Sequence, residues 1–158
     1  MHPSEQMTDF PGVVMSTAPA FHYTNVDPET RAALVALCQE YVWRIDFGYA
    51  ETIPELFTEH GSWSGPWGEM AGQAELATAW TRRATETVKT RHMLTSLRFT
   101  HATPDEALGW VGQIVFVADE TQPMGITPSI IAENMDTYER GQDGLWRFSS
   151  RRVVILAQ

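Results

Sequence analysis

An aspartate and a histidine, far apart in the sequence, are the strongest candidates for acid–base chemistry. Asp46 lies at the border of an apolar stripe with helical spacing, so its carboxylate would be partly removed from water, which costs free energy unless another group compensates. His92 opens a stretch with β-strand alternation, and an imidazole paired with a carboxylate is a suitable general base near neutral pH. The alternatives are an Asp46 that faces solvent or caps the break near Gly48, and a His92 that is an ordinary interior histidine.

Tyr41 lies on the same apolar stripe as a third candidate, because a buried phenol needs a partner for its hydroxyl group. It is either a core tyrosine bonded to a backbone carbonyl or a donor to a substrate oxygen, which is the task of an oxyanion-hole donor. Both interpretations fit the sequence.

Large apolar side chains are abundant, with six Trp, seven Phe, four Tyr and seven Met among 158 residues. This abundance predicts a roomy apolar pocket, although most aromatic residues belong to the core. Candidates for its walls, of which we expect only some to contact a ligand, are Phe57, Trp63, Trp67, Met70, Trp80, Trp110 and Phe116. Asn134 is the polar candidate; it alternates with Asp136, so both point inward or both outward. Arg151 and Arg152 alternate too, and the simplest expectation is an outward guanidinium.

The sequence contains no motif for a metal ion or a nucleotide cofactor. It has neither His-x-His nor His-Glu-x-x-His, and the glycines of residues 61–72 match neither a Walker A loop nor a dinucleotide fingerprint. Cys38 is the single cysteine, which excludes an intrachain disulfide and a thiolate zinc cluster, and its place on the apolar stripe indicates a core residue. We therefore expect no metal and no cofactor.

Charge and hydropathy narrow the class of partner. Eleven Lys and Arg against twenty Asp and Glu give a net charge of −9, which argues against binding to a nucleic acid. No apolar run approaches the roughly 18 residues of a membrane helix, and the first residues show no basic then apolar leader. We expect a cytoplasmic protein whose partner is a small molecule.

The elements that would position these residues follow from periodicity and turn residues. Asp27-Pro28-Glu29 is a typical helix start, and the apolar stripe continues to Tyr49, with Gly48 near the helix end. The further expected elements are a short helix at Ile53–Phe57, a glycine-rich hairpin at His60–Gly72, a helix at Gln73–Val88, and strands at Arg91–His101, Ala107–Ala118, Ser129–Arg140 and Leu145–Leu156.

Helices followed by an uninterrupted antiparallel meander predict an α+β fold. A long helix that lies across a bent sheet encloses a cone with one open end, which suits a small ligand. Residues 1–26 show no periodicity and are expected to form an N-terminal arm, so that residues 27–158 make up the domain.

The order of these elements resembles the nuclear-transport-factor-2-like (NTF2-like) superfamily, and within it the SnoaL-like branch. The resemblance covers roughly residues 28–156. The segments that carry it are Tyr41-Val-Trp-Arg-Ile-Asp46, Phe57-Thr-Glu-His60, Thr90-Arg91-His92, Asp136-Thr-Tyr138-Glu-Arg140, Asp143-Gly-Leu-Trp146-Arg-Phe148 and Arg151. It implies a cone-shaped, curved antiparallel sheet with three helices packed on it, and a homodimer or homotrimer.

The resemblance also implies roles for three residues. In branch members of the scytalone dehydratase and bile-acid 7α-dehydratase type, a first-helix Asp meets a His of the first long strand; this implies His92 as the base, Asp46 as its orienting partner and Tyr41 as a hydrogen-bond donor. One departure concerns Gln113–Phe116, where those dehydratases place a further polar or acidic group and this chain is mostly apolar. The group that assists the leaving group is therefore not identified.

The expected function is that of a cofactor-independent lyase, most simply a dehydratase, acting on a hydrophobic cyclic hydroxy-carbonyl compound such as a steroid, polyketide or aromatic-pathway intermediate. The same residues would serve an isomerase or a polyketide cyclase. A third alternative is a non-catalytic ligand-binding or structural subunit, comparable to the small subunit of ring-hydroxylating dioxygenases.

Overall fold

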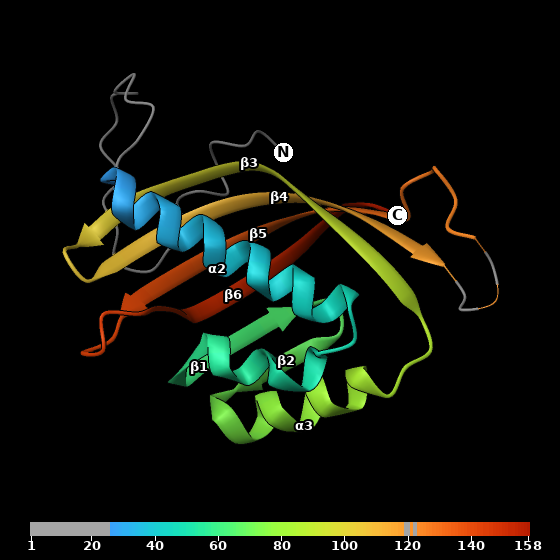
Figure 1. Ribbon diagram of the computed structural model, residues 1–158, viewed down its shortest axis with the longest axis horizontal. Helices are drawn as coiled ribbons and strands as arrows, with labels where there is room; N and C mark the ends of the chain where they lie inside the picture. Colours follow the sequence, from blue (N-terminus) through green and yellow to red (C-terminus); the bar gives the residue numbers. More distant parts are fainter. Residues whose placement is uncertain (1–25, 119–120, 122) are drawn as a thin grey trace.

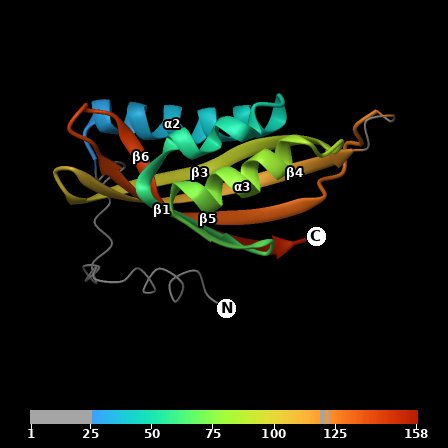
Figure 2. The same ribbon diagram turned by 90° about the horizontal axis from the view of Figure 1, so that it is seen from below.

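The computed structural model describes residues 26–118, 121 and 123–158. Six strands form one open, curved sheet in the order β2-β1-β6-β5-β4-β3, and three helices of the described residues, α2, η2 and α3, pack on one side of it (Figure 1; Figure 2). The predicted α+β architecture is confirmed. The arm expected at residues 1–26 lies, apart from Val26, outside the described residues.

Helix α2 (Pro28–Asp46) begins and ends where the sequence signals place it. The Asp27 carboxylate caps the first turn by accepting a hydrogen bond from the backbone N–H of Thr30 at 2.9 Å, and Pro28 opens the helix. Gly48 follows the last turn with φ at +85°, a left-handed conformation that favours glycine. The helix therefore ends at Asp46, the residue that the sequence singled out.

The segment after α2 forms a short helix and a hairpin. η2 (Ala50–Leu56) is a 3₁₀-helix that contains Pro54, and it leads directly into strand β1 (Phe57–Gly65). Strand β2 (Gly68–Ala71) pairs antiparallel with β1 around the turn at Pro66 and Trp67. The glycine-rich hairpin is thus confirmed, and its first strand starts earlier than expected.

Helix α3 (Gly72–Ala84) is shorter than the predicted Gln73–Val88. The backbone N–H of Thr85 bonds to the Arg82 carbonyl at 3.1 Å, and the Thr85 hydroxyl donates to the same carbonyl at 2.7 Å, so this residue closes the helix. The following Thr87 and Val88 are β-branched and favour extended backbone. The prediction relied on helical spacing alone and therefore did not include this change from helix-favouring to strand-favouring residues.

The four long strands form the predicted antiparallel meander. They are β3 (Lys89–Thr103), β4 (Glu106–Ala118), β5 (Ile130–Arg140) and β6 (Trp146–Ala157). Strand β1, by contrast, pairs parallel with β6, so the sheet is not wholly antiparallel as expected. The reason is topological: α3 carries the chain to the far edge at β3, and the meander then returns to the flank of β1.

The strand register turns a set of side chains toward the helices. On this inner face His92 of β3 lies opposite Val115 of β4, and Gln113 of β4 lies opposite Ala132 of β5. Asn134 and Asp136 follow Ala132 at a period of two and share its face. The sequence left their direction open, and both point inward, since Asn134 is 1% and Asp136 0% exposed.

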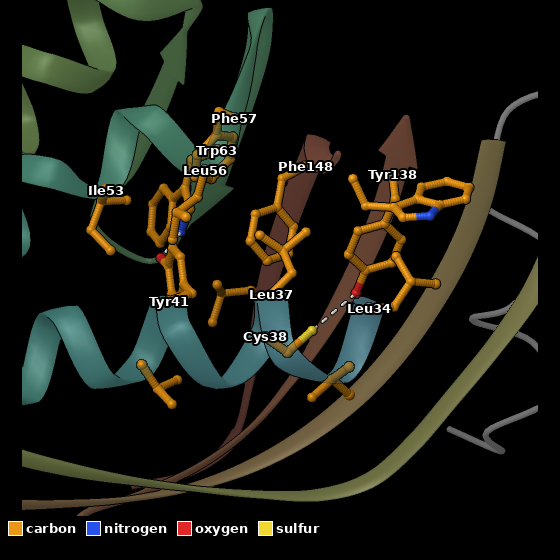
Figure 3. Close-up of a cluster of buried hydrophobic side chains, with 14 of the residues drawn as sticks. Leu34, Leu37, Cys38, Tyr41, Ile53, Leu56, Phe57, Trp63, Tyr138 and Phe148 are labelled. Carbon is orange, nitrogen blue, oxygen red and sulfur yellow. Dashed lines mark hydrogen bonds between the residues drawn. The ribbon is translucent and has the colours of Figure 1, made fainter. Parts of the chain in front are cut away.

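The core lies between α2 and the inner face of the sheet (Figure 3). The Tyr41 ring makes edge-to-face contacts with Trp80 and Phe148, each at 5.6 Å between ring centroids. Cys38 is buried on the same helix face, with its sulfur 3.3 Å from the Tyr138 hydroxyl oxygen, as expected for a core cysteine. This packing holds α2 at a defined distance above β5 and β6.

A buried ion pair lies beneath this aromatic layer. Arg151 donates from Nε and Nη2 to the two carboxylate oxygens of Asp136, at 2.8 and 2.7 Å, and the Tyr138 hydroxyl donates to Asp136 at 2.8 Å. The Arg151 guanidinium also lies 4.1 Å from the centre of the Tyr41 ring. The expectation of an outward guanidinium is thus wrong for Arg151, because its register partner across the strands is Asp136; Arg152 is exposed.

We predict that Asp136→Leu and Arg151→Met each lower the free energy of unfolding by about 3–5 kcal/mol, because each leaves an uncompensated buried charge. The double variant should lose clearly less than the sum of the two, since it removes both charges together. Urea unfolding followed by tryptophan fluorescence measures this. Additive losses would show that the two side chains do not stabilise each other.

Candidate active site

Asp46 and His92 are in direct contact. Asp46 is the last residue of α2 and His92 lies near the start of β3, which passes the end of the helix. The Asp46 Oδ1 atom is 2.6 Å from His92 Nδ1, and the two side chains are 5% and 13% exposed. The predicted spatial meeting of these residues is confirmed.

Three consecutive residues of β3 bind Asp46. The carboxylate accepts hydrogen bonds from the His92 backbone N–H at 2.7 Å and from the Thr90 hydroxyl at 2.8 Å, in addition to the imidazole contact. Arg91 Nη1 donates to the Asp46 backbone carbonyl at 2.8 Å. The side chain and the backbone of Asp46 are therefore both held by β3, which fixes the carboxylate relative to the imidazole.

The protonation states follow from these contacts. Burial raises the pKa of Asp46, but the hydrogen bonds and charge of His92 and the Thr90 hydroxyl outweigh burial and hold the pKa below its ordinary value of 3.8. An ionised carboxylate can only accept, so His92 Nδ1 carries the proton toward Asp46. In the neutral ring this leaves a free electron pair on Nε2, for which the described residues provide no partner.

His92 forms part of the wall of a cavity of about 360 Å³. This volume lies within the range of small-molecule sites, roughly 300–1,000 Å³. The cavity is bounded by α2, α3, the β1–β2 hairpin and the inner face of the meander. Of the residues predicted to act on or bind a ligand, those that line it are Tyr41, Trp63, Trp67, Met70, Trp80, His92 and Asn134.

Three predicted wall residues do not line the cavity. Phe57 is 2% exposed and packs against Tyr41 and Phe148 at 6.3 and 5.2 Å between ring centroids, so it belongs to the core. Trp110 and Phe116 alternate on β4 with Gln113 and therefore occupy the outer face of the sheet. The expectation that these three residues form the cavity wall is wrong.

The sequence analysis missed other lining residues that alternation could have found. Once Gln113 is placed on the inner face, strand periodicity adds Val115 and Val117 on β4 and Ile130 and Ala132 on β5, all of which line the cavity. The missed residues of α3 and the following turn are Ala79, Arg82, Arg83, Glu86 and Val88. These residues were not recognised as lining residues, because the helix was expected to continue to Val88.

Tyr41 is both a core residue and a cavity residue. Its hydroxyl oxygen accepts a hydrogen bond from Trp63 Nε1 at 3.1 Å, which leaves the hydroxyl proton available for donation. Burial raises the pKa of Tyr41 to about 12, against the opposing charge of Arg151. At neutral pH the phenol is therefore protonated and is able to donate to a ligand oxygen.

Two cavity-lining residues each contain a buried polar atom without a partner in the described part of the chain. The two atoms are Nε1 of Trp80, a donor, and Oδ1 of Asn134, an acceptor. Asn134 Nδ2 already donates to Gln113 Oε1 at 3.1 Å. Buried polar groups are nearly always hydrogen-bonded, so these two atoms are exceptions that a bound molecule could satisfy.

Residues 26–118, 121 and 123–158 contain neither a metal-binding cluster nor a membrane-spanning helix. No group of three or more His, Cys, Asp or Glu side chains is placed to hold a metal ion. No helix in these ranges is long and apolar enough to span a membrane.

The chain is similar to one protein family and to several solved structures. Residues 27–152 match the SnoaL-like domain family. A search of curated proteins returned no match. Among solved structures, a protein of unknown function from Mycobacterium tuberculosis is 26% identical, with a TM-score of 0.70 over 80% of this chain and 72% of that chain.

Two structures from Novosphingobium aromaticivorans are also similar. An NTF2-like protein with a cystatin-like fold is 26% identical, with a TM-score of 0.68 over 81% of this chain and 82% of that chain. A protein provisionally named a scytalone dehydratase is 19% identical, with a TM-score of 0.70 over 80% and 84% of the two chains. At this identity the last likeness shows the fold alone. The resemblance inferred from the sequence is confirmed.

We predict that Asp46→Asn lowers the free energy of unfolding at pH 7 by about 1–3 kcal/mol, because an amide replaces a charged hydrogen-bond acceptor. A carboxyl group whose pKa is lowered on folding stabilises the protein above its ordinary pKa of 3.8, and this stabilisation is lost as the pH falls through the lower folded value. The difference between variant and wild type should therefore shrink below about pH 4. Urea unfolding across this pH range measures it.

Asp105→Asn is the matched control, since Asp105 is exposed in the β3–β4 turn. It should change stability by less than about 0.5 kcal/mol. A difference between Asp46→Asn and wild type that stays constant down to pH 3 would contradict the ionic role assigned to this carboxylate.

Proposed function

The chain belongs to the SnoaL-like domain family, and we propose that it is a cofactor-independent lyase of the dehydratase type that acts on a hydrophobic cyclic hydroxy-carbonyl compound. The observation that carries the proposal is the Asp46–His92 contact at 2.6 Å with the imidazole in the wall of an apolar cavity. The dehydratase name given to one structural neighbour agrees with this class of reaction.

The proposed reaction begins with removal of a proton from carbon. Nε2 of His92 takes a proton from a carbon next to the substrate carbonyl, or conjugated with it, and the electron pair moves onto the carbonyl oxygen as an enolate. Asp46 stabilises the imidazolium that forms, because its carboxylate accepts from Nδ1. The shielded position of the pair strengthens this interaction relative to water.

Tyr41 is the proposed donor to the enolate oxygen. Its hydroxyl proton is free, its ring is fixed by Trp80 and Phe148, and it lines the cavity together with His92. A preorganised donor of this kind stabilises charge that develops in the transition state without having to reorient.

The elimination is completed when the enolate collapses and the carbon–oxygen bond of the substrate hydroxyl breaks. The hydroxyl group leaves with the proton that His92 took up, so that water and an unsaturated carbonyl compound are released and the imidazole returns to its neutral form. The acceptor Asn134 Oδ1 is the proposed contact for the substrate hydroxyl, because it is buried and lacks a partner among the described residues.

The apolar rings of the substrate are proposed to bind among four lining residues, Trp63, Trp67, Met70 and Trp80.

Two other classes of function are compatible with the same site. An isomerase or cyclase would use the same base, and product analysis separates these reactions from elimination. A binding module is less well supported, because it gives no reason for a shielded Asp–His pair at an open cavity. We further propose that the protein is a homodimer or homotrimer, which light scattering after size exclusion tests.

We predict that His92→Ala and Asp46→Asn each reduce turnover of bicyclic β-hydroxy ketones by about 10²–10⁴-fold, because one removes the base and the other removes the charge that orients and stabilises it. Formation of the conjugated product, followed by ultraviolet absorbance and identified by mass spectrometry, measures the rate. The wild type must first be shown to convert a member of this panel.

His101→Ala is the matched control for the histidine substitution. His101 is also on β3 and also contacts an aspartate, with Nε2 3.4 Å from Asp27, but it does not line the cavity. It should keep wild-type turnover. If all three variants turn over substrate at the wild-type rate, the assignment of the Asp46–His92 pair is wrong.

We predict that Tyr41→Phe reduces kcat by about 10²–10³-fold while KM changes little, since the hydroxyl acts on charge that exists only in the transition state. Steady-state kinetics on the same substrate separates the two constants. An increase in KM with unchanged kcat would instead assign Tyr41 to ground-state binding.

A further inference from the structure

Two arginines form part of the exposed rim of the cavity. Arg82 and Arg83 lie in the last turn of α3 and line the cavity near its solvent-exposed wall residues Val88 and Val117. Neither guanidinium is held by a short contact. Arg83 Nε is 3.6 Å from Glu86 Oε2, Arg83 Nη2 is 3.4 Å from the Thr90 hydroxyl, and Arg82 has no ion-pair partner among the described residues.

The charge at this rim is opposite to that of the whole chain. The protein carries a net charge of −9, yet the lining residues include two arginines and a single carboxylate, that of Glu86. Because Glu86 is the partner of Arg83, the charge of Arg82 is left uncompensated. The carbonyl groups at the end of α3 would repel an anion, so the guanidinium groups alone account for any attraction.

Trp80, on the same helix, contains a buried N–H donor, which also suits a ligand that accepts hydrogen bonds. Trp80 is 8% exposed, lines the cavity, and its Nε1–H lacks a partner among the described residues. The cavity-lining residues of α3 thus include one buried N–H donor without a partner and two guanidinium groups. Guanidinium groups match the planar geometry of a carboxylate and bind it through two parallel hydrogen bonds.

We infer that Arg82 and Arg83 form an anion-binding subsite, and that the substrate carries a carboxylate substituent. The apolar rings lie among Trp63, Trp80 and Val115, and the carboxylate reaches the rim. This inference rests on the proposed function in so far as it assigns the anion to the substrate of the Asp46–His92 pair. The subsite itself is tested by binding, without turnover.

The test compares naphthoate with naphthamide, which have the same ring system and differ in charge. Isothermal titration calorimetry at low salt should show that the wild type binds naphthoate about five- to tenfold more tightly. Arg82→Gln combined with Arg83→Gln should abolish this preference and leave the affinity for naphthamide within about twofold of wild type. Added salt should weaken the preference, because the arginines are near solvent.

Arg98→Gln is the control, since Arg98 is exposed on β3 and does not line the cavity; it should keep the wild-type preference. Equal affinity of the wild type for the two compounds, no binding of either, or a preference that survives the double substitution would each overturn the subsite. A normal preference for naphthoate together with full turnover by His92→Ala would refute the proposed function and leave the subsite standing.

Discussion

The structure depends on how it accommodates one carboxylate. Asp46 stands at the C-terminal end of α2, where the partial charge of the helix disfavours an anion, and its side chain is largely shielded from water. Both costs are offset by β3, whose residues Thr90 and His92 donate to the carboxylate while Arg91 donates to the Asp46 carbonyl. A shift of β3 by one residue would exchange the faces of all three side chains. The requirement to satisfy Asp46 therefore fixes the position of the first long strand against the helix.

The chemistry of the site follows from that arrangement. With the carboxylate ionised and engaged by Nδ1, the Nε2 atom of this cavity-lining imidazole is the proposed base. A second polar pair, Asp136 and Arg151, is buried on the same face, where the Arg151 guanidinium lies against the Tyr41 and Phe148 rings. The protein thus keeps one ion pair closed within its core and holds one Asp–His pair at the edge of a cavity. Tyr41 contacts both regions, because its ring covers Arg151 and the residue lines the cavity.

Local signals in the sequence were sufficient for much of the fold. The N-cap at Asp27, the glycine at position 48 and the strand alternation after Thr90 act over a few residues, so they were predictable. The position of Asp46 at an apolar border indicated that its carboxylate needs a partner, but the residues alone left that partner open, and the resemblance to the SnoaL-like branch singled out His92. The parallel pairing of β1 with β6 was not, since it depends on the path of the chain across the whole sheet. Trp110 and Phe116 were misplaced because residue type was given more weight than strand alternation, and Arg151 because its partner Asp136 lies on another strand.

The position of the proton on the His92 ring tests the central claim most directly. Heteronuclear NMR of the histidine ring nitrogens, with His92→Ala used to assign the His92 signals, distinguishes the two neutral tautomers. The account predicts that in the neutral form of the His92 ring the unprotonated nitrogen is Nε2, and that Nδ1 carries a proton shifted strongly downfield by the Asp46 carboxylate. A neutral His92 that is protonated on Nε2, or a ring whose signals do not respond to Asp46→Asn, would contradict the account.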